Sequence, residues 1–254
     1  MTESTWDDAI KRTQANMQAP ALKRFYKTVE AVEAENGFAL RLDGRALLTP
    51  AKAKLIVPAR ALAQAIAAEW RAQGETIRPA SMPLTRLANS ALDGVAQTMA
   101  QTAREIAGFA DADLVCYRAL EPESLAARQA AAFDPVLDFA RQALGARFAL
   151  AGAVLHVAQP EAAISAVRSA VEAYADPLAL TALHGLTSLS GSVLIALAVA
   201  RGAMATQAAW AAAHIDEDFQ IEVWGADAEA TARREARGRE FAAAAFTLEA
   251  LRGN

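Results

Sequence analysis

The chain has 254 residues, of which 54% are hydrophobic and 21% charged, and its formal net charge is −4. This composition is typical of a globular protein, long enough for one large domain or two small ones, and it excludes an intrinsically disordered chain. No basic tract is long enough to indicate nucleic-acid binding. The single cysteine, Cys116, excludes an internal disulfide and a cysteine-rich zinc site.

Charge and composition both change along the chain. Residues 1–80 carry 12 basic and 9 acidic side chains, whereas residues 81–254 carry 13 and 20. Residues 25–57 are rich in β-forming and turn residues, and the later sequence is rich in alanine. We therefore predict an α+β protein, with a small antiparallel β-sheet domain and one covering helix in 1–80, followed by a larger all-helical domain in 81–254.

The first region contains short β-forming segments separated by turn signals. The ENG and DG sequences predict hairpin turns, because Asn36, Gly37 and Gly44 tolerate positive φ. A single sheet cannot bury its own apolar face, so another element must cover it. The amphipathic segment 59–75 is suited to that role.

The second region reads as a series of helices. Asp134 with Pro135, and Asp176 with Pro177, each predict a helix start with an N-cap followed by proline. Residues 179–200 carry no formal charge and are long enough to span a bilayer. Because this segment also contains serines, threonines, glycines and a histidine, we favour a buried central helix over a membrane span.

Three consecutive acids, Asp216, Glu217 and Asp218, lie in a segment that continues the predicted helix after residue 206. Neighbouring helical residues are about 100° apart, so these acids spread over roughly 200° of the helix surface. A half-buried helix has no solvent face that wide. At least one acid is therefore expected at the core boundary or in a groove.

Glu217 has apolar and aromatic neighbours at helical spacing. A continuous helix would place Trp210, Ile221 and Trp224 on the same stripe as Glu217. Tryptophans beside a few fixed polar groups are typical of protein-binding surfaces. We therefore interpret this stripe as a candidate partner-binding site.

The sequence lacks the common enzyme motifs for phosphate loops, dinucleotide binding, zinc proteases and nucleophile elbows. His214 and Asp218 have a spacing that a metal can share, but such a pair is common by chance. Cys116 follows Asp111 and Asp113, which oppose a thiolate, so a buried structural cysteine is the favoured interpretation. A small helical hydrolase using Cys116 or a carboxylate site remains the alternative, and no cofactor or metal is expected.

Several segments occur in an order and spacing that resemble a known family. They are RFYK (24–27), LDGR (42–45), Thr49-Pro50, Glu69-Trp70, MPLTRLANSALDGV (82–95), DADLVCYR (111–118), FDP (133–135) and FQIEVWG (219–225). Together they resemble ATP synthase assembly factor 2, the chaperone family that binds the alpha subunit of the ATP synthase catalytic head. The resemblance runs from about residue 22 to the final helix.

This resemblance implies a non-enzymatic chaperone that holds the unassembled alpha subunit and prevents its aggregation until it pairs with beta. It also implies a small β domain followed by a helical domain. In the family an acid of the segment matching 216–225 is functionally important, which here is Asp216, Glu217 or Asp218. Trp70 also looks important to the family, although a core role joining helix to sheet would explain it equally.

The expected partner is thus the ATP synthase alpha subunit, with no nucleic acid, no membrane insertion and a monomeric free chain. The first residues contain acids and no apolar core, so no secretory signal is expected there. A cytoplasmic location follows if the source is bacterial, and the mitochondrial matrix if it is eukaryotic.

Overall fold

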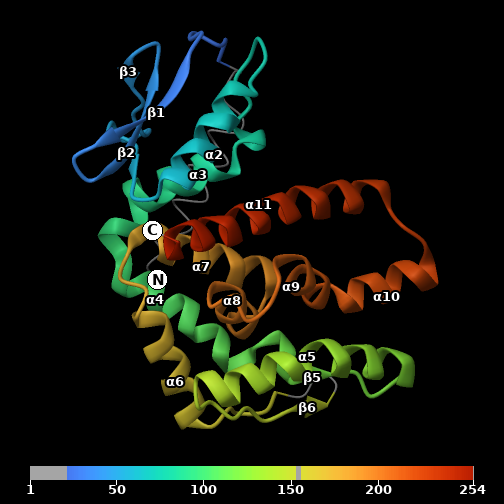
Figure 1. Cartoon of the computed structure of the whole chain (residues 1–254). Helices are drawn as coiled ribbons and strands as arrows, with labels where there is room; N and C mark the ends of the chain where they lie inside the picture. Colours follow the sequence, from blue (N-terminus) through green and yellow to red (C-terminus); the bar gives the residue numbers. More distant parts are fainter. Residues whose placement is uncertain (1–21, 153–155, 254) are drawn as a thin grey trace, which may run out of the picture. The chain divides into compact units, whose positions relative to one another are not determined.

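The computed structural model describes residues 22–152 and 156–253, and it divides into two compact units (Figure 1). The first unit comprises the described residues up to Thr98 together with the C-terminal end from Ala250, and the second is Met99–Glu249. Residues 81–98, which were predicted to begin the helical domain, belong to the first unit. An antiparallel sheet followed mostly by helices confirms the α+β class.

The first unit is built on a four-stranded antiparallel sheet with β2 at its centre. β1 pairs with one side of β2, and β3 and β4 pair with the other. Its elements are β1 (Val29–Ala34), β2 (Gly37–Leu42), β3 (Arg45–Ala46), β4 (Ile56–Val57), α2 (Arg60–Arg71), the 3-10 turn Pro79–Ser81, α3 (Pro83–Ser90), the π-helical turn Ala91–Val95 and the start of α4 (Ala96–Gly108).

Both predicted hairpin turns are present. Gly37 has φ 132°, and a Cβ there would lie 2.5 Å from the carbonyl oxygen of Val57, so only glycine fits. Asp43 and Gly44 both have positive φ, 48° and 77°, as a two-residue type I′ hairpin turn requires. The Asp43 carboxylate accepts hydrogen bonds from the backbone N–H groups of Lys27 and Thr28, which fixes the chain entering β1.

Helix α2 covers one face of this sheet, as predicted for segment 59–75 (Figure 1). The facing side chains are buried: Leu62, Ala63, Ile66 and Ala67 on α2, and Val29, Leu40, Leu42 and Val57 on the strands. Glu69, at the end of α2, accepts hydrogen bonds from the N–H groups of Leu84 at 2.7 Å and Thr85 at 2.8 Å. This carboxylate therefore caps α3 and ties the two helices together.

The second unit is mainly helical but also contains a short parallel strand pair, which the all-helical expectation missed. Its elements are the rest of α4, the 3-10 turns Phe109–Ala112 and Leu114–Cys116, β5 (Tyr117–Arg118), α5 (Glu123–Ala143), β6 (Ala151–Gly152), α6 (Glu161–Glu172), α7 (Pro177–Ser190), α8 (Val193–Ala200), α9 (Thr206–Ala213), α10 (Ile215–Trp224) and α11 (Ala228–Arg252), whose last residues belong to the first unit.

The uncharged segment 179–200 forms the centre of this unit, but as two helices and not one. Gly191, with φ 71°, ends α7, and Ser192 begins α8 by accepting a hydrogen bond from the N–H of Ile195. Every residue of α8 is buried. None of the helices in 22–152 and 156–253 is long and apolar enough to cross a membrane.

The two proline start signals behave differently. Asp176 caps α7 through the N–H of Ala179, with Pro177 in the first turn, as predicted. The start predicted at Asp134 is wrong, because α5 runs without interruption through Pro135. Phe133 and Val136 are buried on either side of this proline, so their packing maintains the helix there.

Candidate functional site

The acids lie in the first turn of α10, but the helix before them is broken. A single helix continuing past residue 206 was predicted, whereas α9 ends at Ala213 and α10 begins at Ile215. His214, with φ −121° and ψ 18°, separates the two helices. The helical spacing that related Trp210 to Glu217 is therefore lost, while Ile221 and Trp224 share α10 with Glu217.

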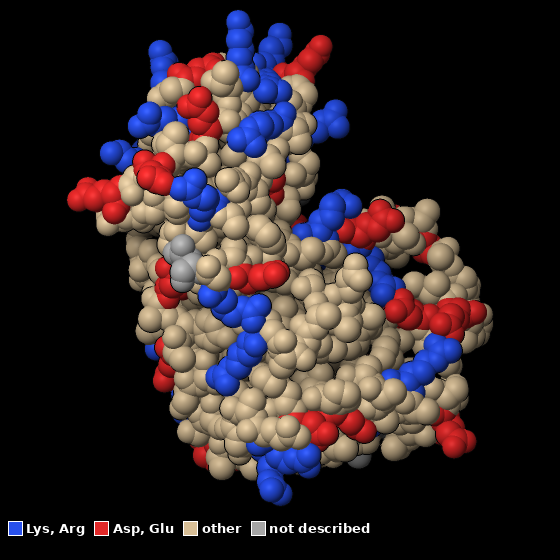
Figure 2. Space-filling model, in the orientation of Figure 1, with Lys and Arg blue, Asp and Glu red and all other residues tan. Residues whose placement is uncertain are grey.

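Most acids of α10 are held by side chains from α5 and α11. The Gln129 side-chain amide donates to Asp216 at 2.6 Å, and Arg128 forms an ion pair with Glu222 at 2.8 Å. Asp218 is paired with Arg234 of α11. Figure 2 shows acidic side chains gathered over the α10 end of this unit with basic ones close by. Three separate contacts thus fix α10 against its neighbours.

Glu217 is different, because its carboxylate has no hydrogen bond or ion pair with any residue that the structure describes. Its side chain is half-exposed. Its negative charge raises the pKa of Arg234, after the larger effect of the hydrogen bond from Arg234 to Asp218. Glu217 is thus a partly screened carboxylate at a helix N-terminus, where a negative charge is favourable.

The two tryptophans near these acids have opposite settings. Trp210 is half-buried, with its ring 3.8 Å from that of His214 and 5.3 Å from that of Phe241. Trp224, at the end of α10, is 86% exposed, and Val223 beside it is 55% exposed. Trp210 therefore joins α9 to α11, whereas Trp224 presents an uncovered indole.

His214 serves the packing of this region. It is buried, and its Nδ1 donates to the Trp210 carbonyl at 2.8 Å. Burial lowers the pKa of His214, so the ring is neutral at pH 7. Asp218 points to Arg234. Within the described ranges, no three His, Cys, Asp or Glu side chains are grouped so that they could hold a metal ion.

Trp70 belongs to the first unit, at the end of α2. Its ring lies 5.5 Å from that of Tyr26, and its carbonyl accepts a hydrogen bond from the Tyr26 hydroxyl at 2.8 Å. Its indole nitrogen is buried and has no hydrogen-bond partner among the described residues. These contacts join α2 to the segment entering the sheet, which is the packing role considered for this residue.

Cys116 lies in the interior of the second unit. It is fully buried, and burial together with the charge of Asp113 raises the pKa of its thiol to about 12. A nucleophilic cysteine needs a lowered pKa and access to substrate. The geometry therefore gives no support to a hydrolase using this thiol.

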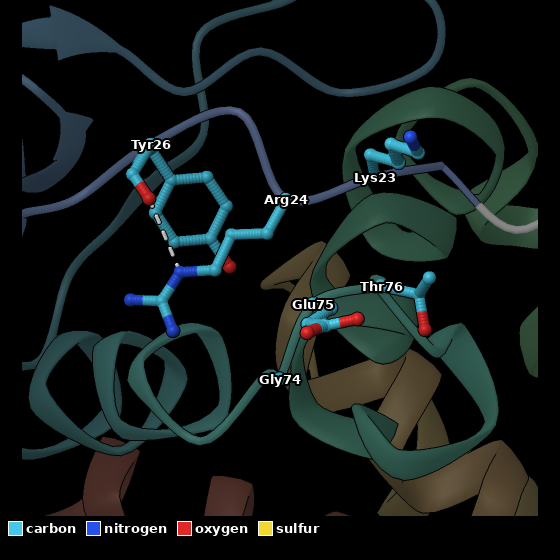
Figure 3. Close-up of a pocket in the computed structure, with 6 residues that line it drawn as sticks. All are labelled: Lys23, Arg24, Tyr26, Gly74, Glu75 and Thr76. Atoms are coloured by element: carbon cyan, nitrogen blue, oxygen red, sulfur yellow. Dashed lines mark hydrogen bonds between the residues drawn. The ribbon is translucent and has the colours of Figure 1, made fainter.

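A hollow of about 540 Å³ in the first unit is structural (Figure 3). It is lined by Lys23, Arg24, Tyr26, Gly74, Glu75 and Thr76. The Arg24 guanidinium donates to the carbonyls of Tyr26 at 3.1 Å and Gln73 at 2.5 Å. The Arg24 guanidinium thus binds backbone carbonyls and holds the segment that enters the sheet against the residues after α2.

Sequence reasoning missed the residues that support α10. Arg128 and Gln129 lie on α5, and Arg234 lies on α11. The two α5 residues are far from the acids in the sequence. Arg128 also lies over the Phe219 ring at 5.6 Å. Nothing local in the sequence marks these side chains, because they follow from how the helices pack.

Comparison with known proteins gives consistent results. The family model described as ATP12 chaperone protein matches residues 23–141. A putative chaperone from Agrobacterium tumefaciens has a similar structure with a TM-score of 0.87 and 47% identity, covering 95% of this chain and 91% of that one.

Atp12 from Paracoccus denitrificans matches with a TM-score of 0.83 and 40% identity, over 90% of this chain and 98% of that one. A variant of the Paracoccus protein with an aspartate replaced by lysine matches with a TM-score of 0.83 and 39% identity, over 90% and 97%. These identities extend over nearly the full length of both chains. The chain therefore belongs to the ATP12 chaperone family, the family of ATP synthase assembly factor 2.

Proposed function

We propose that this ATP synthase assembly chaperone binds the unassembled alpha subunit of the catalytic head and prevents its aggregation until it pairs with beta. The role is that of a binding protein without catalysis. The contact is made by the α10 surface, which we define as Asp216, Glu217, Asp218, Ile221, Val223 and Trp224.

The observation that carries this proposal is the exposure of Trp224. An indole that is 86% exposed beside a half-exposed valine leaves apolar area in water with no benefit to the free protein. Tryptophan is among the residues most often found at the energetic centre of protein interfaces. An unassembled subunit exposes apolar interface of its own, and Trp224 offers that interface an anchor.

Glu217 supplies the charge that sets the orientation of the client. Asp218 and Glu222 already pair with arginines of the same protein, and Asp216 accepts a hydrogen bond from Gln129, so these three carboxylates already have partners. Glu217 is free to pair with an arginine or lysine of the client. Such a pair fixes register and speeds association more than it adds affinity, which suits a chaperone that must later release its client.

The test measures capture of a purified, isolated alpha subunit. Glu217→Lys should weaken capture at least tenfold, which corresponds to about 1.4 kcal/mol, because it places like charges against each other. Trp224→Ala should also weaken it by removing the anchor. Both side chains are at least partly exposed, so circular dichroism should stay unchanged.

Glu172→Lys is the matched control, since Glu172 is an exposed acid at the end of α6 in the same unit. It should bind like the unmodified protein. Full capture by both Glu217→Lys and Trp224→Ala would refute the role of the α10 surface, and failure of the unmodified protein to capture the alpha subunit would refute the choice of client.

A further inference from the structure

The sheet of the first unit has a second face that α2 does not cover. Successive residues of a strand point to opposite faces of the sheet, so the strand register shows which residues share a face. Val32 pairs with Ala39, Ala39 pairs with Ile56, and Leu48 pairs with Lys54. Residues that pair across neighbouring strands lie on the same face of the sheet. We define the outer sheet face by the residues that share this side: Glu30, Val32, Ala34, Ala39, Arg41, Ala46, Leu48, Lys54 and Ile56.

This face is unusually apolar for a surface in contact with water. An antiparallel sheet with one solvated face normally alternates apolar residues inward with polar residues outward. Here Leu48 is 45% exposed, and Val32, Ala39 and Ile56 are half-buried with no helix of the described first unit above them (Figure 1). An apolar sheet face is stable when a second layer covers it.

The rim of the outer sheet face is basic. Arg41 and Lys54 lie on the face and Lys52 lies in the adjoining loop, whereas the face carries one acid, Glu30, which is the cross-strand neighbour of Arg41. These three cations are exposed, and none has an ion-pair partner in the part of the chain that the structure describes. Figure 2 shows lysine and arginine side chains spread over this unit, with acidic side chains among them.

We propose that the outer sheet face docks an amphipathic helix of the client, with its apolar stripe on Val32, Leu48 and Ile56 and its carboxylates against the basic rim. This inference rests on the proposed function for the identity of the client. The helix would supply the missing second layer of the sheet. The basic rim favours a helix with carboxylates along its edge over a basic one, because complementary charges select the partner.

The experiment measures capture of the isolated alpha subunit by two double variants. Leu48→Asn with Ile56→Thr removes the apolar area, and Lys52→Glu with Lys54→Glu reverses the rim. Each should weaken capture at least tenfold. The control, Lys23→Glu with Arg78→Glu, reverses two exposed charges elsewhere in the same unit and should change capture less than twofold. Circular dichroism and the melting temperature establish that each variant is folded.

A photo-crosslinking residue at position 48 identifies what lies on the face. The proposal requires crosslinks to an acidic amphipathic helix of the alpha subunit. Crosslinks to a basic or non-helical segment would overturn it. If the unmodified protein captures the alpha subunit and Glu217→Lys does not, while both outer-face variants bind normally, this inference alone fails. If the unmodified protein does not capture the alpha subunit, the proposed function fails with it.

Discussion

Asp113 shows how single buried polar residues hold the second unit together. It is fully buried, and its carboxylate accepts hydrogen bonds from the N–H groups of Val115 at 3.2 Å and Leu194 at 3.1 Å. It therefore caps α8 from a distant part of the chain, where the helix dipole favours a negative charge. Burial nevertheless outweighs these hydrogen bonds and raises the pKa of Asp113 to about 6.

This raised pKa predicts a specific pH dependence of stability. The folded protein binds the Asp113 proton more tightly than the unfolded chain, whose ordinary value is 3.8. The contribution of Asp113 to the free energy of unfolding is therefore greatest below about pH 4 and is lost as the pH rises to 6. Asp113→Asn removes the titration, so the stability of the unmodified protein relative to this variant should fall between these pH values.

Urea unfolding at several pH values measures this difference. The comparison with the variant is needed because His184 also titrates. Burial lowers the pKa of His184 to about 4, so its contribution to the free energy of unfolding is lost as the pH falls below 6.5. His184 is present in both proteins, so its effect cancels. A difference that stays constant from pH 4 to 6 would show that Asp113 does not titrate in this range.

At the scale of the element, two helices depart from what their sequences predict. α5 continues through Pro135, and the helix before the acids breaks at His214. In α5, a proline removes a backbone donor but the buried Phe133 and Val136 keep the helix in place. At His214, the imidazole binds the Trp210 carbonyl and so takes an acceptor at the end of α9. Tertiary packing thus decides the first case, whereas the second involves a local hydrogen bond between a side chain and the backbone four residues earlier.

Pro135→Ala tests how much stability the protein loses because α5 contains this proline. The alanine N–H can donate to the carbonyl of Ala131, so the free energy of unfolding should rise by about 1 to 3 kcal/mol. Thermal and urea unfolding measure the change. Pro160→Ala is the control, because Pro160 is at the N-cap of α6 and blocks no bond inside a helix. A loss of stability in Pro135→Ala would show that the proline ring contributes more than the missing hydrogen bond.

At the level of the whole molecule, each of the two units has its own core within the residues that the structure describes. The first unit buries Leu40, Val57 and Ile66, and the second buries Leu183 and Ile195. Each unit thus has the apolar interior that independent cooperative unfolding requires. The basic outer sheet face and the acidic α10 surface belong to different units.

Separate cores predict separate opening reactions. Amide hydrogen exchange should give one free energy of opening for β1 and β2 and a different one for α7 and α8. Added urea should lower the free energy of opening of β1 and β2 by the same amount, and that of α7 and α8 by a second common amount. A single common value for all four elements would mean that the units unfold as one.

Local features of the sequence were sufficient to predict the α+β class, the hairpin turns, the covering helix and the cap of α7. These features depend on chemistry between near neighbours, such as the positive φ of Gly44 and the hydrogen bond from Ala179 to Asp176. The order of short segments along the chain was also sufficient to indicate the family. The acids of α10 were identified as candidates, but their individual roles were not.

Those acids are distinguished by their tertiary contacts alone, because their partners come from other helices. Arg128 and Gln129 of α5 and Arg234 of α11 bind three carboxylates and leave Glu217 without a partner among the described residues. Packing likewise half-buries Trp210 and leaves Trp224 in solvent, although both looked alike in the sequence. Local chemistry sets turns and caps, whereas which side chains are free for a partner depends on the neighbours that packing brings to them.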